Sequence, residues 1–308
     1  MIIDQQGALK QYSMKSNLTL STFSLFPAAT VLAAIILCSS CQKSDRQVSN
    51  VSLTQQKMDV TNTAVEASSD DEENFELVME DENNTESANA SDSKVAGKTV
   101  TYSPSKDVYP HTKTIDYGTG FSNGIGTKKS GKIIITYFDS KADANGKYAV
   151  TTYDNYYVNG AHIEGSVQVN KIKNGTGKQV YLHLIDKKIT DANGNIKDFK
   201  CNAQWNVIDW QGGSKNAYQI TEHSTGKQTV NGTEGSFVTD TDNGNPIIKP
   251  FDCKRVQGIL NFKINLGKGN KLDEVLDYGN GVCDNIVTLT INGASKEVTL
   301  PLRFWPLN

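Results

Sequence analysis

The sequence predicts an all-β domain over residues 97–308, built as an antiparallel meander of hairpins. Nine Asn-Gly pairs occur in this region and none before residue 120. Both residues tolerate the positive φ angles that tight hairpin turns require. The segments between these pairs alternate apolar and polar residues, as half-buried strands do. No stretch of about 12 residues carries a helical stripe of period 3.6, so we expect a sandwich or an open, barrel-like sheet.

The expected strands follow one another at short spacing along the chain. They lie at residues 132–137, 165–172, 179–185, 259–266, 285–291 and 296–302. The last two flank Asn292-Gly293 and form the clearest hairpin in the sequence.

The N-terminus predicts a lipoprotein signal peptide over residues 1–40. Phe23 to Leu37 is an apolar run of 15 residues, which suits a secretory core of roughly 7–15 residues better than a membrane span of ~20. Leu37-Cys38-Ser39-Ser40-Cys41 resembles a bacterial lipobox, although Leu stands one position early. We therefore expect Cys41 to be acylated, for example with palmitate, and to hold the chain in the lipid bilayer. A plain cleaved signal peptide and a single-span anchor are the alternatives.

Residues 41–96 predict a flexible, disordered acidic tether. Twelve acidic residues and only Lys57 and Lys94 occur between residues 51 and 96. Such a segment buries too little apolar surface to offset the entropy of ordering, and 55 residues would reach roughly 40 Å. Gln42-Lys43-Ser44-Asp45 is similar to the tract that marks surface export in Bacteroidota lipoproteins. We expect an outer-membrane location, with exposure on the cell surface favoured over the periplasm.

Two pieces of the domain repeat each other. Ile115-Asp116-Tyr117-Gly118-Thr119-Gly120 matches Leu276-Asp277-Tyr278-Gly279-Asn280-Gly281. With Asn155-Tyr156-Tyr157-Val158-Asn159-Gly160 and the Cys283-Asp284-Asn285 that follows the second copy, these motifs resemble a family of uncharacterised Bacteroidota lipoproteins. The resemblance covers most of residues 113–300. It implies an envelope location and an all-β fold, and no activity.

Three cysteines remain in the domain once the signal and the lipidated residue are set aside: Cys201, Cys253 and Cys283. In an oxidising compartment one disulfide can form. We prefer Cys253–Cys283, a loop of about 30 residues worth roughly 3–4 kcal/mol, with Cys201 as a buried thiol on a strand. Cys201–Cys253 is the alternative. These three cysteines form no Cys-x-x-Cys pair, so a structural zinc site is not expected in the domain.

The motif content of the sequence favours binding over catalysis. Dinucleotide, P-loop and hydrolase motifs are absent, and we predict no cofactor, no metal and no catalytic residue. A net charge of −3 argues against nucleic acid as a partner. Exposed aromatic side chains can stack on sugars or anchor a protein, so Tyr156, Tyr157 and Trp210 are the candidate ligand-binding residues.

We therefore expect a lipid-anchored, non-catalytic domain that binds or scaffolds a glycan or another envelope protein. The alternative is a hydrolase of polysaccharide or peptidoglycan that uses Asp116, Asp277 or Asp284, although aspartate before Tyr-Gly more often caps a turn. The third hypothesis is a passive structural role without a ligand. Asp191 and Asp242, in fragments that faintly resemble calcium loops, are also expected to cap turns.

Overall fold

The computed structural model describes residues 72, 74–79, 93–95, 97–122, 127–139, 146–211, 215–230, 233–284 and 286–299. Within them the chain forms sixteen strands of one antiparallel sheet. The strands are β1 Ser93–Val95, β2 Lys98–Ser103, β3 His111–Asp116, β4 Phe121–Ser122, β5 Lys128–Tyr137, β6 Gly146–Val158, β7 Ala161–Lys173, β8 Gln179–Thr190, β9 Ile196–Trp210, β10 Lys215–Val230, β11 Thr233–Thr241, β12 Ile247–Pro250, β13 Gln257–Asn265, β14 Lys271–Asn280, β15 Ile286–Ile291 and β16 Ala294–Thr299.

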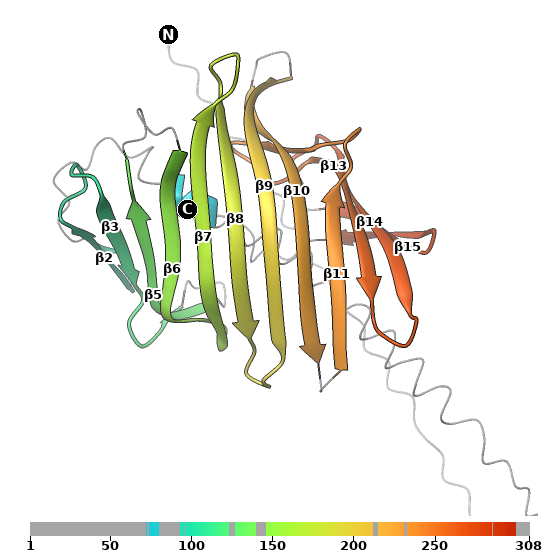
Figure 1. The fold of residues 1–308 in the computed structure, drawn as a ribbon, viewed down its shortest axis with the longest axis horizontal. Coiled ribbons are helices and arrows are strands. Elements are labelled where there is room, and N and C mark those ends of the chain that lie inside the picture. Colours follow the sequence, from blue (N-terminus) through green and yellow to red (C-terminus); the bar gives the residue numbers. More distant parts are fainter. Residues whose placement is uncertain are drawn as a thin grey trace, which may run out of the picture. The chain divides into compact units, whose positions relative to one another are not determined.

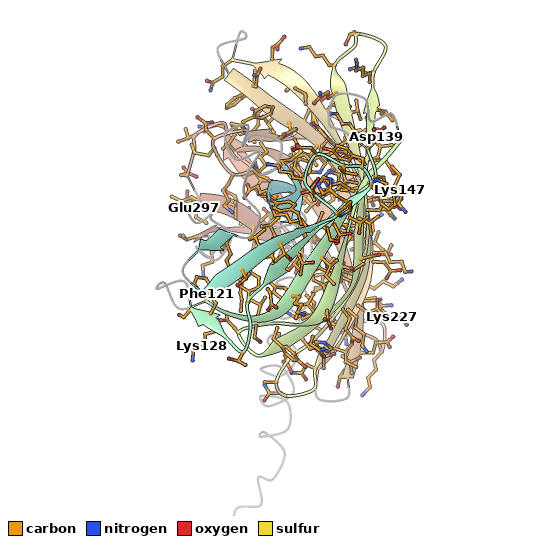
Figure 2. The ribbon with its side chains drawn as sticks, turned by 90° about the vertical axis from the view of Figure 1, so that its left-hand side faces the viewer. Phe121, Lys128, Asp139, Lys147, Lys227 and Glu297 are labelled. Carbon is orange, nitrogen blue, oxygen red and sulfur yellow. A yellow bond between two sulfur atoms is a disulfide. The ribbon has the colours of Figure 1, made fainter. Side chains whose placement is uncertain are left out.

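The strand order follows the chain. The sheet runs β1-β2-β3-β5-β6-β7-β8-β9-β10-β11-β13-β14-β15-β16, with β4 and β12 as short side branches. Figure 1 shows this meander spread across the view, and Figure 2 shows that the sheet is curved, so that its two ends turn toward the same side. The predicted all-β, antiparallel hairpin fold is confirmed, and among the described residues it is one curved sheet rather than two packed sheets.

Two of the nine Asn-Gly pairs make hairpin turns with the predicted geometry. Asn159 and Gly160 join β6 to β7 with φ angles of 52° and 84°, and Asn292 and Gly293 join β15 to β16 with 49° and 83°. Positive φ at both positions is the type I′ turn, whose twist matches that of paired strands. The Asn-Gly pattern therefore fixes both hairpins locally.

The backbone at Gly131 accepts only a glycine. It lies at a bulge between β5 and β6 with φ of 77°. A Cβ there would stand 1.9 Å from the carbonyl oxygen of Asn155. Its backbone exchanges hydrogen bonds with the first Asp-Tyr-Gly motif, from Tyr117 N to Gly131 O and from Gly131 N to Gly118 O.

The sheet has an apolar inner face and a polar outer face. On β9, Phe199, Cys201 and Trp205 are buried on the inner face, whereas Lys200 and Asn202 are exposed on the outer face. This alternation places most of the core on the concave side of the sheet.

A short helical segment, residues 72 and 74–79, belongs to this core. It lies within residues 41–96, for which the sequence predicts a flexible tether, and here the structure differs. Phe75 is 3% exposed and Val78 is fully buried, both within the core of the sheet. The reason is amphipathicity: Phe75, Val78 and Met79 are spaced i, i+3 and i+4 on one helical face. Apart from this segment and β1, residues 41–96 lie outside the described residues, as does the predicted signal peptide over residues 1–40.

Candidate functional site

The helical segment is held on the inner face by a cage of rings around Phe75. The Phe75 ring centroid lies 5.0 Å from Tyr181 and 4.8 Å from His183 of β8. It lies 4.9 Å from Trp205 of β9 and 5.4 Å from Tyr218 of β10. These distances are within the range of favourable edge-to-face and tilted ring contacts. Three neighbouring strands therefore supply the aromatic cage that surrounds Phe75.

Arg255 ties the start of the helical segment to the sheet. Its Nε donates to Glu72 Oε1 at 2.5 Å, and its Nη1 lies 3.0 Å from Glu222 Oε2 on β10. The guanidinium also lies over the ring of Tyr278, 5.7 Å from its centroid. All four side chains are buried. A buried guanidinium with two carboxylates is stable only because the charges compensate each other.

The electrostatics of this cluster follow from burial and pairing. Burial alone would lower the pKa of Arg255, but Glu222, Tyr278 and Glu72 raise it well above its usual value. Burial raises the pKa of Tyr278 to about 12, against the opposing effect of Arg255. Arg255 is thus permanently charged and Tyr278 is neutral at physiological pH.

Polar side chains hold the rest of the helical segment. Tyr153 OH donates to Asn74 Oδ1 at 2.9 Å, and Tyr137 OH donates to the Val78 carbonyl at 3.1 Å. Lys113 Nζ donates to the Leu77 carbonyl at 3.5 Å. The last carbonyls of a helix have no partners within it, so these two donors cap its C-terminal end.

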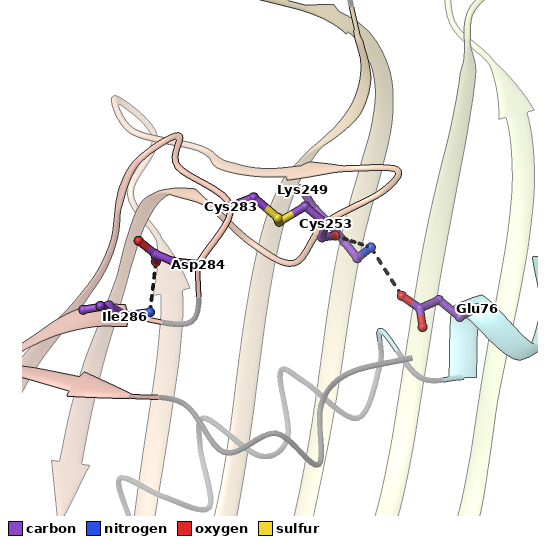
Figure 3. Close-up of a disulfide and its surroundings, with 6 residues drawn as sticks. All are labelled: Glu76, Lys249, Cys253, Cys283, Asp284 and Ile286. Atoms are coloured by element: carbon purple, nitrogen blue, oxygen red, sulfur yellow. Dashed lines mark hydrogen bonds and ion pairs between the residues drawn. A yellow bond between two sulfur atoms is a disulfide. The ribbon is translucent and has the colours of Figure 1, made fainter. Parts of the chain in front are cut away.

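A lysine links the segment to the disulfide region. Lys249 Nζ lies 3.4 Å from Glu76 Oε1 and donates to the Cys253 carbonyl at 3.0 Å (Figure 3). Burial raises the pKa of Glu76 despite the neighbouring Lys249. Cys253 is bonded to Cys283, which confirms the preferred pairing.

The third cysteine of the domain, Cys201, is buried on β9 and takes no part in the disulfide. Its alternative pairing with Cys253 is therefore not the one found. Cys41, the predicted lipidation residue, lies outside the described residues.

The outer face carries a shallow groove of about 530 Å³ over β8–β11. Two cross-strand rows line it: Leu184, Asn202, His223 and Asp240 in one, and Leu182, Gln204 and Thr221 in the other. Side-chain amides and hydroxyls both donate and accept hydrogen bonds. The groove is therefore suited to a ligand with the same mixed hydrogen-bonding character.

Charges around this groove are paired across neighbouring strands. Lys200 Nζ lies 2.6 Å from Asp186 Oδ2, and His223 Nδ1 lies 2.6 Å from Asp240 Oδ1. Lys227 lies 3.2 Å from Glu234. Because cations and anions alternate, these pairs give the face no strong field of one sign.

The structure separates the aromatic residues predicted to bind a ligand. Tyr156 is 3% exposed and packs on Tyr153 in the core, so it has no surface for a ligand. Tyr157 is exposed and stacks on His162. Trp210 is half-buried at the end of β9.

The strand register shows how far apart the two surface aromatics are. Tyr157 pairs with His162, His162 with Thr190, and Thr190 with Ile196 at the start of β9. Fourteen residue steps then separate Ile196 from Trp210, roughly 46 Å at the rise of a strand. Tyr157 and Trp210 therefore cannot form one aromatic platform.

The aspartates of the repeated motifs cap turns. Asp116 Oδ1 accepts from Gly118 N at 2.7 Å, and Asp277 Oδ1 accepts from Gly279 N at 2.8 Å. Asp284 Oδ1 accepts from Ile286 N at 3.0 Å (Figure 3). The two copies of the Asp-Tyr-Gly motif thus share one local geometry, which is a structural role for their carboxylates.

The two fragments that resemble calcium loops have the same geometry. Asp191 Oδ1 accepts from the backbone of Asn193 and Asn195, and Asp242 Oδ1 accepts from that of Gly244 and Asn245. Both are Asx turns, as predicted. In the part of the chain that the structure describes, no group of three or more His, Cys, Asp or Glu side chains is arranged to hold a metal ion.

Comparisons with known protein families, with curated proteins and with solved structures find no match. Among the described residues, no helix has the length and apolar character needed to cross a membrane. The two faces of the sheet are therefore the features from which function can be inferred.

The sequence does not predict the buried contacts that hold the helical segment on the inner face. Arg255 and Glu72 are 183 residues apart in the chain, and no local pattern joins them. The signal that could have found the segment is the apolar triad Phe75, Val78 and Met79 at helical spacing inside an acidic run.

Proposed function

We propose that this chain is a lipid-anchored protein of the bacterial outer membrane, held by acylated Cys41, and that its sheet is a non-catalytic binding domain for a neutral glycan. The observation that carries the binding proposal is the groove on the outer face of β8–β11. Asn202, Gln204 and Thr221 offer hydrogen-bond donors and acceptors there, while Leu182 and Leu184 offer apolar contact. Sugars present the same combination of hydroxyls and apolar C–H surface.

The geometry of the groove supports an extended ligand. Its two rows lie two residues apart along the strands, roughly 7 Å, and four adjacent strands span about 14 Å. Leu184 is 44% exposed, so apolar surface is available without any rearrangement. The hydrolase alternative receives less support, because the aspartates it needs are engaged in turns.

A glycan array probed with the purified chain tests the ligand. We expect binding to neutral oligosaccharides and at least a tenfold weaker signal for the double variant Asn202→Ala/Gln204→Ala. Lys227→Ala, on the same face outside the groove lining, serves as the matched control and should bind like the parent. Equal binding by the double variant, or no neutral glycan bound at all, would refute the glycan proposal.

Metabolic labelling with a palmitate analogue tests the anchor separately. Cys41→Ala should abolish labelling and release the protein from membranes, whereas Cys201→Ala should leave the label in place. Continued labelling of Cys41→Ala would contradict the lipoprotein proposal without affecting the glycan proposal. Protease treatment of intact cells then distinguishes the outer surface, where the domain is lost, from the periplasm, where it is protected.

A further inference from the structure

The inner face recognises the helical segment through specific groups along its whole length. Arg255 donates a hydrogen bond to Glu72, and Tyr153 donates one to Asn74. Phe75 fills the aromatic cage of β8–β10. This is the geometry of a binding site for an acidic amphipathic helix with one phenylalanine, in which cationic and aromatic groups match the charge and shape of the ligand.

The helix of this segment depends on the sheet for its stability. Its described residues, 72 and 74–79, bury Phe75 and Val78 against the sheet, and the stability of a protein helix comes mostly from such packing. The segment therefore acquires its helix only on docking. Once undocked, it can be bound by any inner face that presents the same groups.

We infer that the inner face also binds the helical segment of a second copy of this chain, so that two copies exchange their segments. A second copy is the partner certain to carry the matching chemistry, because each contact depends on the chain's own Glu72, Asn74 and Phe75. The exchange is reciprocal, each inner face receiving the partner's segment, and it forms a closed, two-fold dimer. Domain swapping of this kind needs no new contact surface.

Native mass spectrometry of mixed chains tests the exchange on the wild-type protein. ¹⁵N-labelled and unlabelled chains are mixed over a range of concentrations. We expect mixed-mass dimers at high concentration that an excess of a peptide spanning residues 69–82 suppresses. The same peptide with Phe75→Ala should not suppress them. Monomers at every concentration, or dimers that the wild-type peptide leaves intact, would overturn the inference.

A second measurement asks whether the site accepts the segment in trans. The full chain with Phe75→Ala should gain several degrees in Tm when the wild-type peptide is added, and nothing when the Phe75→Ala peptide is added. If that variant does not fold, Asn74→Ala, which removes the bond from Tyr153, takes its place. Absence of a Tm gain at saturating peptide would refute the exchange. Neither measurement involves the outer-face groove, so the glycan proposal stands or falls separately.

Discussion

The two faces of the sheet use the same kinds of charged side chain in opposite environments. On the inner face, Arg255 is buried between Glu72 and Glu222 and fixes a segment from far away in the chain. On the outer face, Lys200 and Asp186 form an equally short pair that is exposed to water. The N–O distance alone therefore does not determine how much an ion pair stabilises the fold. Burial decides whether a pair holds the fold together or only keeps a surface soluble.

Removing the cation from each pair should give the largest contrast. Arg255→Ala leaves two buried carboxylates without their shared partner, so we expect a loss of about 3–5 kcal/mol in the free energy of unfolding. Lys200→Ala should cause no measurable change, since water screens the pair. Urea unfolding followed by circular dichroism measures both. Similar shifts for the two variants would contradict the distinction between the faces.

Two phenylalanines, one buried and one exposed, test the effect of burial without charge. Phe75→Ala empties the aromatic cage and should cost about 3–5 kcal/mol. Phe138 is 40% exposed and lies beneath Lys147, so Phe138→Ala should cost less than ~1 kcal/mol. A small effect of Phe75→Ala in the same unfolding assay would mean that the segment contributes little to the core.

Removal of the disulfide should cause the next largest loss of stability. Cys253 and Cys283 close a loop with a sequence separation of 30 residues, and the Cys253 carbonyl positions Lys249 beside Glu76. The double variant Cys253→Ser/Cys283→Ser should lose roughly 3–4 kcal/mol through the greater freedom of its unfolded chain. Reductant should destabilise the wild type by a similar amount and leave the double variant unchanged. A wild type insensitive to reductant would show that the bond adds no stability.

The contrast between the faces also explains what the sequence could predict. Asn159-Gly160 and Asn292-Gly293 form turns through their own backbone geometry, so a few residues are enough to predict these two hairpins. Three cysteines in the domain limit the possible disulfides to a few pairings, of which the sequence favours Cys253–Cys283 and leaves Cys201–Cys253 open, and the structure shows the first.

The candidate sites were largely beyond local prediction. The apolar triad of the helical segment indicates a local helical turn, but no local pattern identifies its partners, such as Arg255, which lie far along the chain. The outer groove depends on which strands are neighbours, and the register that separates Tyr157 from Trp210 is a property of the whole sheet. Sequence patterns report local geometry, whereas both sites are assembled by non-local pairing.

The smallest expected effect concerns Tyr278, which lies against Arg255 on the inner face. Burial raises the pKa of this phenol to about 12, whereas in the unfolded chain it ionises near 10. Because the unfolded state loses its proton first, the stability contributed by neutral Tyr278 is present below about pH 10 and is lost as the pH rises through 12. Two pKa units correspond to roughly 2–3 kcal/mol.

Tyr278→Phe should therefore show a shallower fall in stability between pH 10 and 12 than the wild type, whatever its stability at pH 7. Urea midpoints measured across this range provide the comparison, and the difference between the two slopes removes the contribution of lysines common to both proteins. Parallel slopes would mean that the Tyr278 phenol ionises as readily in the folded as in the unfolded chain. The inner face would then be accessible to water near Arg255, and the distinction between a dry inner face and a solvated outer face would fail at that point.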